Sequence, residues 1–211
     1  TYPLLRWFHR RSQSVMVNTP SMENLLRTRG FRNLRRWTRG VDTDLFRPSS
    51  EPFLLDARPI HLYVGRVAVE KNLEAFLDLD LEGTKYVVGD GPQLKSLQMR
   101  YPDVRFTGFK YGADLARYFA SADVFVFPSR TDTFGLVMLE ALSCGVPVAA
   151  YPVTGPTDVI TDPQIGALDF NLKKAIQQAY KLSRQACRDF ALQFSWQASA
   201  RQFLSNLYPI V

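Results

Sequence analysis

Between residues 60 and 150, short apolar runs alternate with segments of helical character. Ile60–Val64 and Val124–Phe127 are hydrophobic at nearly every position, which suits strands buried on both faces of a parallel sheet. Strands that alternate with helices predict an α/β fold with a Rossmann-like, doubly wound parallel sheet and helices on both of its faces. The predicted strands are residues 60–64, 84–88, 104–107, 124–127 and 146–150, and the predicted helices are residues 70–79, 92–100, 113–120 and 134–143.

The segments on either side of this region have simpler patterns. Residues 15–17 and 33–38 are predicted to form short strands around a helix that Gly30 ends. Residues 39–59 mix prolines with turn residues, as linkers and loops do. Residues 171–211 are predicted to be helical.

Basic side chains are concentrated at the N-terminus. Residues 1–40 hold nine arginines and a single acid, Glu23, so this segment has a net charge of +8 while the rest of the chain has −2. A basic segment can bind nucleic acid or an anionic membrane surface. Because no nucleic-acid-binding motif accompanies the arginines, we expect peripheral contact with a membrane and no nucleic-acid partner.

The compartment is inferred from what the sequence lacks. No apolar run approaches the roughly 20 residues that span a bilayer, and the N-terminal segment is too rich in arginine for a signal peptide. The two cysteines, Cys144 and Cys187, form no metal or redox motif. We therefore expect a cytoplasmic protein that contacts the inner face of the membrane.

Glu140 is the most unusual residue of the predicted helix 134–143. Its neighbours from Phe134 to Leu142 are apolar or glycine, so this helix has no polar face and is expected to be buried. An unpaired buried charge is costly, so the carboxylate needs a partner. That partner is either an internal salt bridge or hydrogen bond, or a ligand. Asp132 or Thr133 is predicted to cap the start of the helix, and Gly145 to end it in a left-handed conformation.

Each predicted strand ends in a loop with residues suited to ligand binding, at the edge where open α/β sheets bind ligands. After the first strand, Gly65 lets backbone approach a ligand, and Arg66 and Lys71 bring two cations that can hold phosphate. A solvated, charged helix start is the alternative. After the second strand, the segment from Gly89 to Gly91 predicts a tight turn that can also admit a ligand.

The third and fourth loops extend this pattern. Phe109 can stack on a nucleobase and Lys110 can reach a phosphate, although an ordinary exposed loop explains both equally well. The fourth loop carries Asp132 and leads into a helix start, which favours anions. Asp132 and Glu140 are therefore expected to converge with free amide groups on one pocket. That layout suits a ligand with sugar hydroxyls and a diphosphate.

Several ordered motifs carry a resemblance to a known family. They are Gly65-Arg66…Glu70-Lys71-Asn72, Val88-Gly89-Asp90-Gly91-Pro92, Phe106-Thr107-Gly108, and Pro128-Ser129…Thr133-Phe134-Gly135-Leu136…Glu140-Ala141…Gly145-Val146-Pro147-Val148. Through them the chain resembles the nucleotide-sugar-binding half of glycosyltransferase family 4. These are retaining enzymes of the GT-B fold, which has two Rossmann-like domains. Gly40-Val41-Asp42…Phe46-Arg47-Pro48 resembles the family's interdomain segment.

The resemblance implies a division of the chain. Residues 1–38 would be the tail of an N-terminal acceptor domain or a linker, residues 39–59 the interdomain segment, residues 60–170 the donor-binding core, and residues 171–211 C-terminal helices. Because most of an acceptor domain is absent, we expect the chain to bind donor but to transfer sugar poorly or not at all. We also expect self-association through the exposed interdomain face.

The resemblance also implies roles for individual residues. Arg66 and Lys71 would bind the donor diphosphate and stabilise it as a leaving group. Glu140 matches the second acid of the family's Glu-x7-Glu motif and would hold the ribose hydroxyls. Asp132 matches the first acid, which contacts the donor sugar, but is one methylene shorter than the family's glutamate. The other residues expected to bind substrate are Gly65, Gly89, Gly91, Phe109, Lys110, Arg130, Thr133, Phe134, Gly135 and Leu136.

The function implied is transfer of a hexose, mannose or glucose, from a GDP- or UDP-sugar to a lipid or glycan acceptor. No metal and no further cofactor would be needed in the donor site. One alternative is a sugar-nucleotide epimerase of the GT-B fold, although such an enzyme would need additional acids and histidines around the donor. The other is a non-catalytic nucleotide-binding module.

Overall fold

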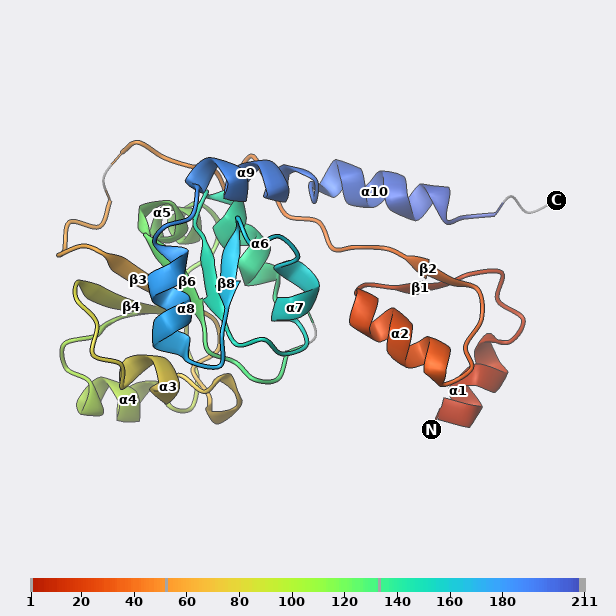
Figure 1. Cartoon of the computed structure of the whole chain (residues 1–211), viewed down its shortest axis with the longest axis horizontal. Coiled ribbons are helices and arrows are strands. Elements are labelled where there is room, and N and C mark those ends of the chain that lie inside the picture. The colour runs from red at the N-terminus through yellow and green to blue at the C-terminus, as the bar shows by residue number, and fades with distance from the viewer. Residues whose placement is uncertain (1, 52, 133, 209–211) are drawn as a thin grey trace. The chain divides into compact units, whose positions relative to one another are not determined.

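The computed structural model describes residues 2–51, 53–132 and 134–208. The chain divides into two compact units (Figure 1). The first unit combines Thr1–Gly40 with Phe194–Val211, and the second is Val41–Gln193. Among the described residues, no helix has both the length and the apolar character needed to cross a membrane.

The first unit is a parallel β-α-β element with two further helices. Strands β1 (Val15–Val17) and β2 (Leu34–Arg36) pair in parallel, and α2 (Pro20–Thr28) connects them. The N-terminal helix is α1 (Tyr2–His9), and α10 (Trp196–Ser205) comes from the end of the chain. The core of this unit is small and consists of Val17, Phe31 and Leu34, with Tyr2, Val15, Met22 and Leu26 packed against them.

Hydrogen bonds join α10 to the segment that follows β2. The Trp37 indole donates to the Ser199 hydroxyl at 3.2 Å, and the Thr38 amide donates to the Gln202 side chain at 2.6 Å. Residues about 160 positions apart in the sequence therefore belong to one unit.

The second unit contains the predicted doubly wound sheet, so the fold class is confirmed. Six parallel strands lie in the order β5-β4-β3-β6-β7-β8. The strands are β3 (Ile60–Val64), β4 (Thr84–Val88), β5 (Arg105–Gly108), β6 (Val124–Phe127), β7 (Val148–Ala150) and β8 (Gly166–Leu168). The helices are η1 (Val69–Lys71), α3 (Glu74–Leu77), α4 (Leu94–Arg100), α5 (Gly112–Ser121), α6 (Leu136–Ser143), α7 (Pro156–Val159), α8 (Leu172–Ala179) and α9 (Arg184–Leu192).

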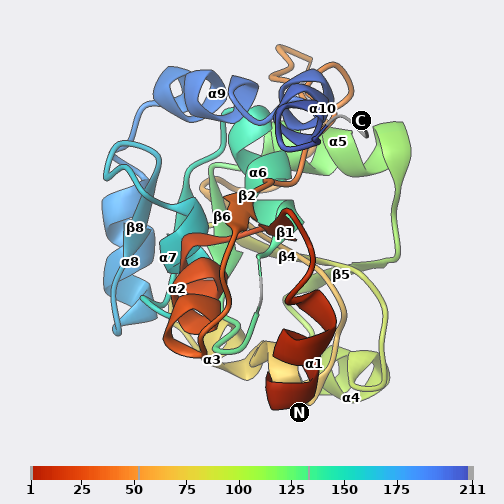
Figure 2. The ribbon, with the colours of Figure 1, turned by 90° about the vertical axis from the view of Figure 1, so that its right-hand side faces the viewer.

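Helices cover both faces of this sheet (Figures 1 and 2). Side chains of α3, α4 and α8 join Val124 and Val126 of β6 in one buried cluster. The alternate β6 residue Phe125 contacts Phe119 of α5, with ring centroids 5.6 Å apart. Because successive strand residues point to opposite faces, both faces of β6 are buried, as its continuous apolar sequence predicts.

Two predicted helices differ from the structure at their starts. The helix expected over residues 70–79 is interrupted at Asn72, which has φ +54, so η1 precedes a separate α3. Helix α6 begins at Leu136 and has Gly135 at its N-cap, so Asp132 does not cap it as predicted. Gly135 adopts φ +71, which glycine reaches without the steric cost that other residues pay. Thr133 lies outside the described residues.

The C-terminal end of α6 is as predicted. Gly145 has φ +72, its amide bonds to the carbonyl of Leu142, and the Val146 amide bonds to that of Ala141. This is the Schellman arrangement that satisfies the last carbonyls of a helix.

Glycines allow the strand-end loops of this sheet to pack backbone against backbone. A Cβ atom at Gly89 would lie 1.9 Å from the carbonyl oxygen of Gly65, and one at Gly91 would lie 2.3 Å from that of Val67. Backbone hydrogen bonds join the same loops, from Val67 to Asp90 at 2.9 Å and from Gln93 to Val67 at 3.1 Å. The edge of the sheet therefore has little room for side chains larger than hydrogen at these positions.

We predict that Gly89→Ala destabilises the protein by about 3 kcal/mol or more, because the new methyl overlaps backbone that cannot move aside. Gly108→Ala is the matched control. Gly108 also has a positive φ, +73, but its added Cβ meets nothing within 4 Å, so a cost of only about 1 kcal/mol is expected. Thermal unfolding checks both; similar losses of Tm in the two variants would contradict this explanation.

Candidate functional site

A cavity of about 610 Å³ opens at the carboxyl edge of the sheet. It lies beside the point where β3 and β6 are neighbours and the strand order reverses, the usual place for ligands in open α/β sheets. Glu140 lines it together with loop residues that follow β3, β4 and β5. The lining residues are Leu45, Phe46, Val64, Gly65, Arg66, Val88, Gly89, Asp90, Phe109, Lys110, Tyr111, Gly112, Leu115, Val137 and Glu140.

Glu140 is half-buried and lines this cavity with its carboxylate. Its Oε2 atom is buried and has no hydrogen-bond partner among the described residues. Burial raises the pKa of Glu140 from 4.5 to about 7, because the ionised form loses its hydration. No internal salt bridge to Glu140 is found within the described part of the chain, which leaves Oε2 available to a ligand.

The two predicted cations occupy different surroundings. Arg66 lines the cavity, is largely exposed, and lies 3.6 Å from Glu70. Lys71 is more buried, and its Nζ atom lies 2.7 Å from Oδ2 of Asp132. The side-chain amide of the next residue, Asn72, donates to the carbonyl of Pro128 at 3.0 Å. These two contacts tie the loop after β3 to the loop after β6.

The start of α6 is tightly packed around Gly135. A Cβ atom there would lie 2.6 Å from the Met138 side chain. Phe134 is buried, whereas Leu136 is 39% exposed. Because the first amide groups of a helix have no acceptor within it, they are available to an anion.

The loop after β5 forms an aromatic rim. Phe109 and Tyr111 are 70% and 76% exposed, and their rings stack with centroids 6.1 Å apart. Lys110 lies between them in the sequence and also lines the cavity. A flat ring system with one cation beside it is suited to a nucleobase attached to a phosphate.

Only some of the residues predicted to bind the donor line this cavity. Arg130 stacks over the ring of Tyr151 at 4.8 Å and does not line the cavity. Asp132 faces Lys71 and is also absent from the lining. The predicted residues in the lining are Gly65, Arg66, Gly89, Phe109, Lys110 and Glu140, and those outside it are Lys71, Gly91, Arg130, Asp132, Phe134, Gly135 and Leu136. Thr133 lies outside the described residues.

One wall of the cavity was missed by sequence reasoning. Leu45 and Phe46 belong to the linker expected over residues 39–59, yet both line the cavity. Arg188 of α9 fixes this segment by donating to the carbonyls of Phe46 at 2.8 Å and Thr43 at 2.9 Å. The sequence offered one signal, the resemblance of Gly40-Val41-Asp42…Phe46-Arg47-Pro48 to the family's interdomain segment, but it did not place Leu45 and Phe46 at the cavity.

The described residues contain no cluster of three histidine, cysteine, aspartate or glutamate side chains that could hold a metal ion. The charged residues of the lining are Arg66, Asp90, Lys110 and Glu140, and the ion pair of Lys71 with Asp132 lies outside it. The arrangement can bind a ligand that combines negative charge, hydroxyl groups and a flat ring.

Curated proteins that are similar in sequence include named glycosyltransferases. The GDP-mannose-dependent alpha-mannosyltransferase of Mycobacterium tuberculosis is 38% identical over 174 residues, which cover 77% of this chain and 46% of that protein. The sulfoquinovosyl transferase SQD2 of Arabidopsis thaliana is 33% identical over 189 residues, covering 80% of this chain and 36% of that protein. The chain thus spans about half the length of these relatives, or less.

Solved structures agree on the fold. Sucrose-phosphate synthase from Thermosynechococcus elongatus matches with a TM-score of 0.82 at 27% identity, over 97% of this chain and 60% of that chain. HepE of Anabaena in complex with UDP matches with a TM-score of 0.79 at 19% identity, over 98% of this chain and 67% of that chain.

A family model described as glycosyl transferases group 1 matches residues 58–182, which include all six strands of the second unit. The chain therefore belongs to the family of glycosyl transferases group 1.

Proposed function

We propose that this chain is the donor-binding half of a retaining hexosyltransferase. It binds a nucleoside-diphosphate hexose and presents the sugar for transfer to a lipid or glycan acceptor. The observation that carries the proposal is the Glu140 carboxylate at a cavity of about 610 Å³, whose Oε2 atom is buried and has no hydrogen-bond partner among the described residues. Ribose hydroxyls are donors that would satisfy it.

Each part of the donor has a matching part of the site. The ribose hydroxyls donate to Glu140, and the base lies against the rim formed by Phe109 and Tyr111. Arg66 holds the diphosphate and stabilises it as it leaves with the electrons of the broken sugar–oxygen bond. Lys71 exchanges its contact with Asp132 for a phosphate oxygen.

The rest of the donor contacts the start of α6. Amide groups at Phe134, Gly135 and Leu136 would bind the phosphates or the sugar, and Asp132, once released from Lys71, would accept hydrogen bonds from sugar hydroxyls. Without a metal, the diphosphate charge is balanced by the two cations and these amides.

The proposed donor is a GDP-hexose, with mannose as the sugar. Two further relatives, 39% and 34% identical over most of this chain, are also GDP-mannose-dependent alpha-mannosyltransferases. Because this chain covers less than half of each relative, we propose that transfer also requires an acceptor domain outside it.

We further propose that the protein acts at the cytoplasmic face of a membrane. The arginine-rich first unit supports this, since a net charge of +8 over residues 1–40 favours an anionic surface. We also propose self-association through the face that would meet an acceptor domain, because exposed apolar surface there would favour it. A sedimentation coefficient that rises with concentration would support self-association, and a constant monomer value would contradict it.

A panel of sugar nucleotides tests the donor. We expect GDP-mannose to bind at least tenfold more tightly than UDP-glucose or ADP-glucose by calorimetry, and the chain alone to transfer no sugar to added acceptors. Absence of binding to every donor would contradict the proposal. Conversion of GDP-mannose to another sugar nucleotide without acceptor would favour an epimerase. Nucleotide binding without transfer, even after fusion to a complete acceptor domain, would favour a non-catalytic module.

Glu140→Gln should have opposite effects on stability and binding. The folded-state pKa of about 7 lies above the ordinary 4.5, so the carboxylate destabilises the unoccupied protein increasingly as pH rises through this range. The glutamine variant should therefore gain up to about 3 kcal/mol of stability at pH 8 and almost nothing below pH 4.5. Its affinity for GDP should fall about 10- to 100-fold at pH 8, because hydrogen bonds to a charged acceptor are lost.

Chemical unfolding and calorimetry of the same samples give both measurements. Glu82→Gln is the matched control, because Glu82 is exposed at the amino end of β4 and away from the cavity. Unchanged GDP affinity in a folded Glu140→Gln variant would remove Glu140 from the ribose site.

A further inference from the structure

Asn72 lies directly after Lys71, in the loop that follows β3. Its backbone has φ +54 and ψ +39, which is a left-handed conformation. This conformation is unfavourable for most residues that carry a side chain, and asparagine adopts it more readily than they do. The turn at Asn72 separates η1 from α3, so this residue sets where the segment that carries Lys71 ends.

The side chain of Asn72 also contacts the loop after β6. Its amide donates to the carbonyl of Pro128 at 3.0 Å, and Pro128 is buried directly after the end of β6. A buried carbonyl needs a hydrogen-bond donor, and Asn72 supplies one. The adjacent Lys71 contacts the other end of the same loop, with its Nζ atom 2.7 Å from Oδ2 of Asp132. Two neighbouring residues of one loop therefore hold both ends of the other.

The short helix η1, which ends at Lys71, is anchored by the residues on either side of it. Ala68 before it and Leu73 after it are buried. Val69 and Glu70 within it are exposed, Val69 to 75%. Because the middle of this turn lies in solvent, the position of Lys71 depends on the anchors at the two ends. Asn72 belongs to the second of these.

The two contacts between the loops differ in what donor binding would do to them. In the proposed function, Lys71 exchanges Asp132 for a phosphate oxygen, so this ion pair opens when the donor binds. The bond from Asn72 to Pro128 joins groups that are not proposed ligands of the donor. It can therefore persist while Lys71 changes partner. A binding side chain that its neighbours already hold in place loses less freedom when the ligand arrives.

We propose that Asn72 is a positioning residue for Lys71. Through its bond to Pro128, it fixes the spacing between Lys71 and the loop that bears Asp132, both before and after the ion pair opens. It acts on the donor only through Lys71. The inference rests on the proposed binding of the donor diphosphate by Lys71 and adds how that cation is held.

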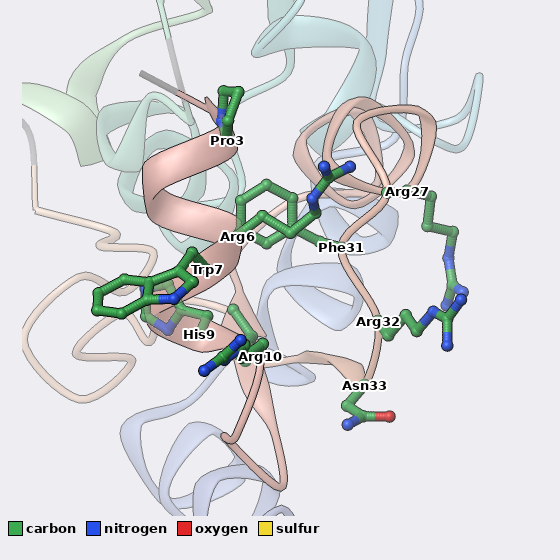
Figure 3. A pocket seen from close by; sticks show the side chains of 11 residues that line it. Pro3, Arg6, Trp7, His9, Arg10, Arg27, Phe31, Arg32 and Asn33 are labelled. Carbon is green, nitrogen blue, oxygen red and sulfur yellow. The ribbon is translucent and has the colours of Figure 1, made fainter.

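A matched pair of substitutions tests this role. Asn72→Gly removes the side-chain amide but keeps the left-handed backbone, which glycine adopts freely. Asn33→Gly is the control, because Asn33 also has a left-handed backbone, with φ +55, and its amide donates to the carbonyl of Ser12 at 3.3 Å. Asn33 lines a separate cavity in the first unit (Figure 3) and does not line the cavity that holds Glu140. The same chemical change is thus made beside Lys71 and away from it.

Calorimetry with the full chain measures binding of GDP and of guanosine, which has no phosphate. Asn72→Gly should weaken GDP binding about fivefold, the usual effect of immobilising one flexible side chain on binding, and should leave guanosine binding unchanged. Asn33→Gly should change neither. Lys71→Met should weaken GDP binding about 30-fold, because a hydrogen bond between charged groups is lost. Adding Asn72→Gly to Lys71→Met should cause no further loss.

The other outcomes contradict different claims. If Lys71→Met weakens GDP binding and Asn72→Gly does not, the positioning role is overturned and the proposed function stands. Equal losses for GDP and guanosine, or the same loss from Asn72→Gly in the Lys71→Met background, would indicate a general loosening and would also overturn the inference. Unchanged GDP binding by Lys71→Met would contradict the proposed role of Lys71, and this inference with it. Far-ultraviolet circular dichroism of each variant verifies that the fold is retained.

Discussion

The functional edge of the second unit depends on backbone packed directly against backbone. Gly65 and Gly89 follow adjacent parallel strands, and the space between them admits no Cβ atom at Gly89. Hydrogen bonds from Val67 to Asp90 and from Gln93 to Val67 continue the connection beyond the ends of the strands. Loops joined in this way do not need a ligand to bring them together, so the cavity is largely formed before anything binds.

The tight packing of the second unit explains how the fold accommodates a carboxylate oxygen that is buried without a partner among the described residues. Glu140 lies on a helix whose other residues are almost all apolar, and its Oε2 atom is buried without a hydrogen-bond partner in the described part of the chain. The surrounding packing holds it there, and Met138, Leu139, Ala141 and Leu142 of the same helix are fully buried. If Glu140 holds the ribose as proposed, hydroxyl donors of the ligand would offset the stability lost at this carboxylate.

The sequence predicted features set by local pattern and missed those set by distant contacts. Continuous apolar strands, alternating helices and the left-handed Gly145 follow from neighbouring residues, and all are present. The predicted start of α6 was wrong. The left-handed Gly135, which packs against Met138, sets this boundary, whereas a polar cap was expected to set it. The wall formed by Leu45 and Phe46 was missed because Arg188, more than 140 residues away, fixes its position.

The contact between Lys71 and Asp132, 2.7 Å long, has a consequence for selectivity. While the site is empty, the cation and the carboxylate neutralise each other. If Lys71 binds phosphate as proposed, a small anion such as inorganic phosphate would displace Asp132 from Lys71 without supplying the hydroxyl groups of a sugar. A sugar diphosphate replaces both partners at once, with phosphate oxygens for the lysine and hydroxyl groups for the aspartate. Under the proposed function, this contact therefore favours a ligand that carries both a phosphate and sugar hydroxyl groups over free phosphate.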